Sequence, residues 1–160
     1  MSLVKTEFDD GVLTVTLCDE ENRNTLSVAL TSELAKTLDE AELNPEVRAI
    51  VLTNSGRVFC AGADLSERSS KKESSSKTKP VDPLEIFGRF RKSSKPYIGK
   101  IAGHCVAGGM GIAAAMDISI ASEEAKFGFT EVRIGVAPAI ISVLCLPKMR
   151  PSEASEAFLR

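Results

Sequence analysis

Two glycine-containing segments and one downstream acid carry the residue types that could do chemistry. Residues 59–65 read FCAGADL, residues 106–111 read VAGGMG, and Glu131 follows shortly afterwards. Small residues let the backbone approach a ligand, and each segment is expected to run from a strand or turn into a helix, where backbone N–H groups lack partners. Two such N–H groups aimed at one point would form an oxyanion hole, and a carboxylate beside them could move a proton next to a polarised carbonyl.

Phosphate binding is the main alternative interpretation of these glycines. Neither segment is followed by Lys-Ser or Lys-Thr, and residues 108–111 (GGMG) do not fit Gly-x-Gly-x-x-Gly, so nucleotide binding is disfavoured. Taken singly, Gly108 and Gly109 would suit close helix packing, and residues 61–63 would suit a tight turn with Asp64 as a helix N-cap. The two segments together, with an acid downstream, favour the catalytic interpretation.

The composition excludes several other classes of protein. The 160 residues suffice for one domain with a real core, and the 43% hydrophobic and 26% charged content is that of a globular protein. A net charge of -2 provides no basic field for nucleic acid. The longest apolar stretch, residues 134–146, is interrupted by Gly135, Pro138 and Ser142 and is too short for a membrane span. The N-terminus has no secretion signal, so we expect a cytoplasmic protein without a membrane partner.

Cysteine and histidine usage argues against metal and triad chemistry. The four cysteines form no Cys-x-x-Cys pair, so we expect neither a metal site nor a disulfide framework but buried free thiols. His104 is the only histidine, and no Gly-x-Ser-x-Gly elbow accompanies it.

Strands and helices alternate around the two segments. Residues 3–8 and 12–17 predict a hairpin across an Asp-Asp-Gly turn. Ser27 is placed to cap a helix that ends before Pro45, because apolar residues recur at helical spacing, and residues 47–53 predict a buried parallel strand. The apolar positions of that helix are Leu30, Leu34, Leu38 and Ala41.

The second half of the chain continues the alternation. Residues 66–79 are rich in Ser, Lys and Glu and predict a surface loop, after which a helix begins near Asp82-Pro83. Further strands are expected at 97–102 and 117–121, and further helices at 108–116 and 138–146, with the start of another at 150–160. The pattern predicts an α/β fold with a parallel sheet and a ligand site at the ends of its strands.

Four blocks of sequence carry a resemblance to a known family. Residues 59–65, 107–111, 117–121 (DISIA) and 126–135 (KFGFTEVRIG) resemble the enoyl-CoA hydratase/isomerase (crotonase) superfamily in order and spacing. The resemblance covers essentially the whole chain. It implies a crotonase-like α/β fold, a spiral core of repeated ββα-type units, and an acyl-CoA thioester as substrate, so that coenzyme A is part of the substrate and no separate cofactor is expected.

The resemblance also implies roles for individual residues. The N–H groups of Ala63 and Gly108 would form the oxyanion hole, where one donor contributes roughly 3 to 4 kcal/mol to the transition state. Glu131 matches the second catalytic glutamate, and its pKa would be raised in an apolar pocket so that it exchanges a proton near neutral pH. Arg23 is a further candidate for CoA phosphates, although a solvated surface charge explains it equally well. The segment expected to border the CoA moiety includes Ala61, Ala63, Asp64, Leu65 and Ser66, with Gly108 beside it.

One position departs from the family pattern. Members with two acids carry the first of them three residues after the oxyanion glycine, where this chain has Gly111. Hydration would then require Glu131 to serve both proton transfers, whereas isomerisation of a 3-enoyl to a 2-enoyl thioester needs only one base. Because residues 131–142 look most like members grouped as hydratases, we predict a hydratase, with an isomerase as the alternative.

The length suggests a third possibility. Family members continue for about a hundred further residues, comparable to a small domain, which supply helices that close the acyl pocket and build a trimer. We therefore expect residues 1–160 to be a crotonase-like core that lacks this C-terminal trimerisation region. The chain would be either a fragment of a homo-oligomeric enzyme, a trimer or dimer of trimers, or an inactive CoA-ester-binding or assembly module.

Overall fold

The computed structural model describes residues 2–64 and 83–159. The chain opens with an antiparallel hairpin of β1 (Val4–Asp9) and β2 (Val12–Leu17). Asp10 and Gly11 at its tip both have positive φ, 39° and 80°, which is the backbone geometry that a two-residue hairpin turn of this hand requires. The predicted hairpin and its turn are confirmed.

The large sheet continues from this hairpin in the strand order β1-β2-β3-β5-β7. Strands β3 (Ala49–Asn54), β5 (Tyr97–Ile101) and β7 (Ile118–Ala121) join β2 in parallel. Their positions agree with the strands predicted from sequence, and the parallel pairing is that of an α/β fold.

A second, smaller parallel sheet consists of β4 (Val58–Cys60), β6 (His104–Val106) and β8 (Phe127–Gly128). Each of its strands follows directly after a strand of the large sheet: β4 after β3, β6 after β5, and β8 after β7. Helix α4 (Gly108–Ala115) follows β5 and β6, and the helical segment η1 (Thr130–Ile134) follows β7 and β8. The chain therefore winds as repeated ββα-type units. The residue pattern did not predict these strands individually, because segments of two or three residues carry no period of their own.

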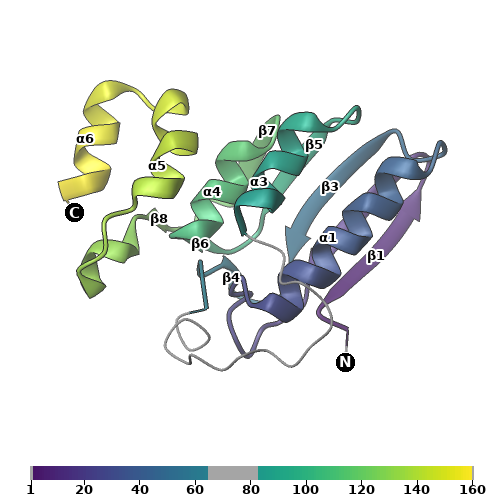
Figure 1. Ribbon diagram of the computed structural model, residues 1–160, viewed down its shortest axis with the longest axis horizontal. Coiled ribbons are helices and arrows are strands. Elements are labelled where there is room, and N and C mark those ends of the chain that lie inside the picture. The colour runs from purple at the N-terminus through teal and green to yellow at the C-terminus, as the bar shows by residue number, and fades with distance from the viewer. Residues whose placement is uncertain (1, 65–82, 160) are drawn as a thin grey trace.

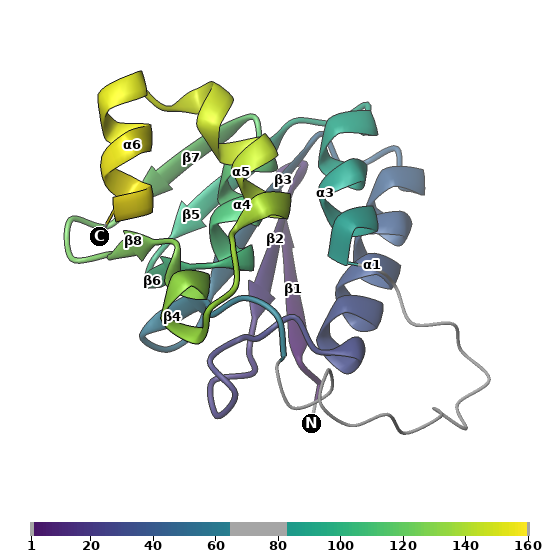
Figure 2. The same ribbon diagram turned by 60° about the vertical axis from the view of Figure 1, so that its left-hand side comes forward.

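Helix α1 (Val28–Leu43) forms as its sequence predicts. The Ser27 hydroxyl accepts a hydrogen bond from the Leu30 N–H at 3.2 Å, and the helix ends at Asn44, immediately before Pro45. The four predicted apolar positions are all buried. Figures 1 and 2 show α1 lying beside α3 (Pro83–Lys92) against one face of the large sheet.

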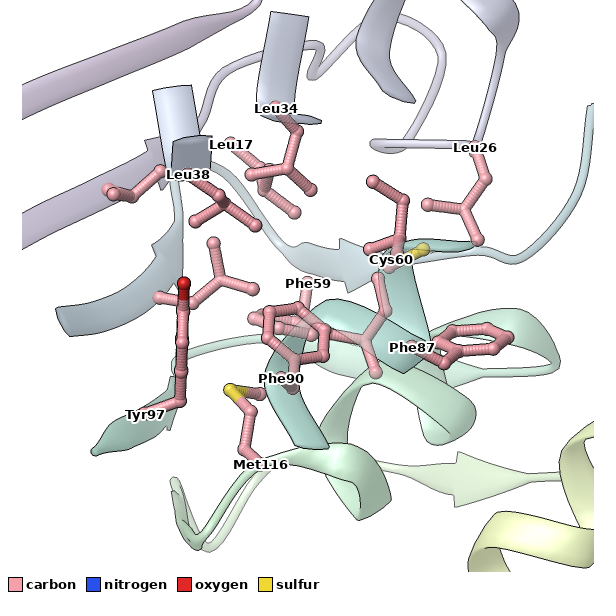
Figure 3. Close-up of a cluster of buried hydrophobic side chains, with 14 of the residues drawn as sticks. Leu17, Leu26, Leu34, Leu38, Phe59, Cys60, Phe87, Phe90, Tyr97 and Met116 are labelled. Carbon is pink, nitrogen blue, oxygen red and sulfur yellow. The ribbon is translucent and has the colours of Figure 1, made fainter. Parts of the chain in front are cut away.

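The core joins these helices to the strands of both sheets. Figure 3 shows Leu34 and Leu38 of α1 facing Phe59, Phe90 and the other buried side chains. The four cysteines are free, and three of them are buried as predicted, whereas Cys18 is only partly buried.

From Thr130 onward the described chain is mainly helical. The short turn η1 (Thr130–Ile134) leads into α5 (Ala139–Cys145), which packs on α4 (Gly108–Ala115), and η2 (Leu146–Lys148) leads into α6 (Pro151–Leu159). Within residues 2–64 and 83–159, every helix is too short or too polar to cross a bilayer.

Candidate active site

The two glycine-containing segments meet in space at a distance that only glycine allows. Gly62 has φ +90°, and a Cβ added to it would lie 2.6 Å from Ala107 Cβ and 2.9 Å from Gly108 N. Such separations are below any normal contact. The backbone of residues 61–63 therefore rests directly against the start of α4.

The small sheet is what brings these segments together. Strands β4 and β6 are parallel neighbours with Cys60 opposite Cys105, so the chain leaves both strands at the same edge. Leu26 fixes the first segment because its N–H donates to Gly62 O at 2.7 Å. The Ala107 N–H donates to Gly128 O of β8 at 3.0 Å and fixes the second.

The N–H groups of Ala63 and Gly108 are available to a ligand. Gly108 is the first residue of α4, so its N–H has no intrahelical acceptor, and a Cβ on Gly108 would lie 3.7 Å from Ala63 N. Over the described ranges, neither N–H donates a hydrogen bond. Two neighbouring donors that have no partner among the described residues, one of them at a helix N-terminus, are what an oxyanion hole needs, and their role as one stays a prediction.

Ala107 holds a strained backbone conformation between these donors. Its φ of 49° and ψ of -126° are unusual for an alanine, and such conformations cost about 1 to 3 kcal/mol. The surrounding contacts hold Ala107 in this conformation, and they thereby fix the direction of the next peptide N–H, which belongs to Gly108.

Glu131 lies in the first turn of η1, and one of its two carboxylate oxygens has no partner among the described residues. Its Oε2 atom is buried and finds no hydrogen-bond partner among the residues that the structure describes. Burial raises the pKa of Glu131, and the pKa of Cys145 on α5 is in turn raised to about 11 by burial and by the nearby Glu131 charge. Since a carboxyl group with a raised pKa can take and return a proton closer to neutral pH, Glu131 is suited to acid–base chemistry.

Gly111 lies one turn of α4 beyond Gly108, and its Cα faces packed side chains. A Cβ on Gly111 would lie 2.9 Å from Phe87 Cζ and 3.0 Å from Ile141 Cγ2. Phe87 and Ile141 are each only 4% exposed, so neither can swing into solvent. The space that a side chain at position 111 would enter is therefore filled by two apolar side chains, one from α3 and one from α5.

The residues expected to border CoA are only partly described. Arg23 lies next to the first segment, because its carbonyl accepts the Ala61 N–H at 3.1 Å, and its side chain is exposed. Ala61 and Asp64 are half-buried. Leu65, Ser66 and the predicted loop at 66–79 lie outside the described residues, as do the residues that an Asp64 N-cap would serve.

Two cavities of the described structure lie elsewhere. One of about 620 Å³ is lined by the ends of α3 and α4 and by α5 and η2, and another of about 570 Å³ lies between α1 and α3. Neither is lined by Ala63, Gly108 or Glu131. We locate the candidate site from its donors and its carboxylate.

Four residues near the site were missed by sequence reasoning. Leu26, Phe87, Ile141 and Cys145 look like ordinary core residues in the sequence. The one signal available was the spacing of Ile141 and Cys145, which lie four residues apart and therefore on one face of a helix.

Among residues 2–64 and 83–159, no three His, Cys, Asp or Glu side chains cluster in a way that could hold a metal ion.

Known proteins share both the sequence and the fold. An (E)-benzylidenesuccinyl-CoA hydratase from Thauera aromatica is 33% identical over 157 residues, which cover 98% of this chain and 61% of that protein. The crystal structure of an enoyl-CoA hydratase from Mycobacterium avium matches with a TM-score of 0.81 at 37% identity, covering 99% of this chain and 62% of that one. An enoyl-CoA hydratase/isomerase structure from Mycobacterium paratuberculosis matches with a TM-score of 0.83 at 32% identity, over 98% and 60% of the two chains.

The chain thus spans about 60% of the length of these relatives. The comparison confirms the predicted crotonase-like α/β fold. A match to the family described as enoyl-CoA hydratase/isomerase covers residues 7–159. The chain belongs to the enoyl-CoA hydratase/isomerase family, the crotonase superfamily.

Proposed function

We propose that this protein acts on acyl-CoA thioesters through an enolate and adds water to a 2-enoyl-CoA. Two observations support the proposal: the neighbouring N–H groups of Ala63 and Gly108, and the buried Oε2 atom of Glu131, all have no hydrogen-bond partner among the described residues. The names of two relatives support the same chemistry, because both are called hydratases of CoA thioesters.

In the proposed hydration, Glu131 starts as the carboxylate. It removes a proton from water as the water oxygen bonds to C3 of the substrate, and the electron pair of the C2–C3 double bond moves onto the thioester oxygen. The N–H groups of Ala63 and Gly108 stabilise that oxyanion. Protonated Glu131 then returns the proton to C2, the carbonyl re-forms, and the product is a 3-hydroxyacyl-CoA.

A second candidate reaction is isomerisation of a 3-enoyl-CoA to a 2-enoyl-CoA. Glu131 would take a proton from C2, the double bond would shift to C2–C3, and the same proton would return to C4. This reaction needs one carboxylate and no water. Glycine at position 111 favours it, because the position of the first family acid then carries no carboxylate.

The CoA moiety is proposed to lie along residues 61–66, with Arg23 near its phosphates. The hydrogen bond from the Ala61 N–H to the Arg23 carbonyl supports this, since it brings the Arg23 backbone next to Ala61 while the Arg23 side chain is exposed. A binding module without catalysis would use the same contacts.

Assembly into a homo-oligomer is also a proposal. Large apolar side chains on the edge strand β7 and on α5 face solvent, with Ile118 at 58%, Ile120 at 64% and Val143 at 71% exposure. Surfaces of this kind are typical of interaction sites.

The reaction is tested by supplying each substrate separately. We expect a trans-2-enoyl-CoA to yield 3-hydroxyacyl-CoA, measured by chromatography of the products. Conversion of a 3-enoyl-CoA alone, with no hydration, would replace the hydratase with the isomerase. Binding of acyl-CoA without turnover of either substrate would show a binding module.

A further inference from the structure

We infer that Asn24 is a positioning residue that sets the direction of the Ala63 N–H, acting through Leu26, which lies two residues later in the chain. The catalytic consequence rests on the proposed function, because it requires the Ala63 N–H to stabilise an oxyanion. The orientation itself does not, because it can be measured on the protein without a substrate.

The side chain of Asn24 joins the loop after β2 to β4. It is completely buried, its Oδ1 accepts the Asp19 N–H at 2.8 Å, and its Nδ2 donates to the Val58 carbonyl at 2.8 Å. The Asn24 N–H donates to the Asp19 carbonyl, also at 2.8 Å. Because a buried amide without partners would cost free energy, these bonds hold the loop in one place relative to β4.

The backbone of this loop turns sharply toward the first glycine-containing segment. Arg23 and Asn24 have φ values of 56° and 51°, a left-handed conformation that asparagine tolerates and arginine adopts less readily. Two such residues in succession persist only where the surrounding contacts fix them. The turn brings the Arg23 carbonyl to the Ala61 N–H at 3.1 Å and the Leu26 N–H to the Gly62 carbonyl at 2.7 Å.

The hydrogen bond from Leu26 determines where the Ala63 N–H points. The Gly62 carbonyl and the Ala63 N–H belong to one planar trans peptide group, so they point in opposite directions. Because the Leu26 N–H holds the carbonyl, the Ala63 N–H is directed away from the Leu26 N–H. Since Gly62 has the broad backbone freedom of glycine, this peptide group could rotate if that bond were lost.

Leu26 also lies against the residue that carries the second donor. Its side chain is only 5% exposed, and a Cβ on Gly108 would lie 3.1 Å from Leu26 Cδ1. Leu26 therefore holds the peptide group of the first donor through its backbone and packs beside the second donor through its side chain. A shift of the loop at Asn24 would change both contacts.

The orientation is tested by measuring residual dipolar couplings of the backbone N–H bonds, which report the direction of each bond. We expect Asn24→Gly to change the coupling of Ala63 and to leave the couplings of α1 unchanged. Glycine adopts a φ of 51° without strain, so this variant removes only the side-chain bonds. An unchanged Ala63 coupling would overturn the inference.

Asn22→Gly is the matched control for this measurement. Asn22 lies in the same loop, and its Nδ2 donates to Asp19 Oδ1 at 2.9 Å rather than to β4. We expect its Ala63 coupling to equal that of the wild type, and a change as large as that in Asn24→Gly would overturn the specific role of Asn24.

Asn24→Asp is the second variant, which is used if Asn24→Gly does not fold. Aspartate has the size of asparagine, tolerates the left-handed conformation and keeps an acceptor for the Asp19 N–H. Its carboxylate cannot donate to the Val58 carbonyl. The coupling of Ala63 should therefore change in this variant too, and a wild-type coupling would overturn the inference.

The catalytic consequence is tested by separating kcat from KM. For the reaction that the wild type catalyses, Asn24→Gly should lower kcat roughly 10- to 100-fold and keep KM within about threefold, because an oxyanion hole acts in the transition state. Asn22→Gly should change neither. A raised KM with an unchanged kcat would indicate a role in binding and would overturn the inference.

Failure of the proposed function would give a different result. If the wild type turned over neither a 2-enoyl-CoA nor a 3-enoyl-CoA, the proposed function would fail. The dipolar couplings would still decide whether Asn24 orients the Ala63 N–H.

Discussion

Glu42 and Glu131 are two glutamates whose surroundings differ in almost every respect. Glu42, near the end of α1, accepts hydrogen bonds from the Ser93 hydroxyl, from the Ser94 N–H at 2.9 Å and from the Ser94 hydroxyl at 2.6 Å. These bonds lower its pKa to about 2. Glu131 has a buried Oε2 without a partner among the described residues, and burial raises its pKa.

The difference separates a carboxylate that stabilises the fold from one that the fold leaves unsatisfied. At the α1–α3 junction, Lys95 adds a hydrogen bond to the Ala41 carbonyl at 2.6 Å, so the end of α1 is capped by residues that follow α3. By contrast, the N–H groups of Ala63 and Gly108 and the Oε2 atom of Glu131 have no hydrogen-bond partner within residues 2–64 and 83–159. Leaving buried polar groups open costs stability, which makes this region the better candidate for chemistry.

The largest expected effect is on turnover at Glu131. We expect Glu131→Gln to reduce the rate of either proposed reaction by roughly 10²- to 10⁴-fold, because the amide cannot exchange the proton. Glu42→Gln is the control and should leave the rate unchanged. Steady-state kinetics with both substrates measure the contrast, and equal rates for wild type and Glu131→Gln would remove Glu131 from the mechanism.

The next effect concerns Gly62, the glycine at which the two glycine-containing segments touch. Gly62→Ala should lower the melting temperature by roughly 5 to 10 °C, since it adds both a positive-φ alanine and a clash with Ala107. Gly88→Ala on α3 is the control, because nothing lies within 4 Å of its Cβ position. That change should raise the melting temperature slightly, as alanine favours a helix by about 1 kcal/mol. Similar melting temperatures for the two variants would contradict the close approach.

The stabilising role of Glu42 should depend on pH. Its folded pKa of about 2 lies below the ordinary value of 4.5, so its contribution is present above pH 4.5 and is lost as the pH falls toward 2. Glu42→Gln should therefore be less stable than wild type at neutral pH, by about 1 kcal/mol after solvent screening. Thermal unfolding across this range measures the gap, and a gap that does not narrow toward pH 2 would argue against the hydrogen-bonded carboxylate.

The smallest expected effect is on the stability of the Glu131→Gln variant, which we expect to be more stable than wild type, whereas Glu42→Gln is expected to be less stable. Because the folded pKa of Glu131 is raised, the favourable protonated form is fully populated below pH 4.5 and is lost as the pH rises through that pKa. Glu131→Gln should therefore melt at a higher temperature than wild type, by a margin that grows above pH 4.5. A margin that shrinks with rising pH would indicate an ionised carboxylate that is stabilised by its surroundings.

Local features of the fold were predictable from the sequence. The Asp10-Gly11 turn, the Ser27 cap and the apolar face of α1 each depend on residues only a few positions apart. The candidate donors and Glu131 could also be named, because their motifs resemble those of the family. The resemblance supplied their roles, which remain predictions.

The small sheet and the packing of side chains around Gly111 were not predictable in the same way. Strands β4, β6 and β8 have two or three residues each and exist because they pair with one another across long stretches of chain. The contact between Gly111 and Phe87 joins α4 to α3, and the contact with Ile141 joins it to α5.

The sequence by itself determined which groups are available for chemistry: small residues at two turns, one acid in the second family position, and no acid at Gly111. Only the tertiary structure decided that the two turns touch, that the Oε2 atom of Glu131 is buried without a partner among the described residues, and that Phe87 and Ile141 fill the space beside Gly111. The physical reason is the distance along the sequence over which each kind of interaction acts. Backbone preferences and caps act over a few residues, whereas distances and burial between remote segments depend on how the two sheets and their helices pack.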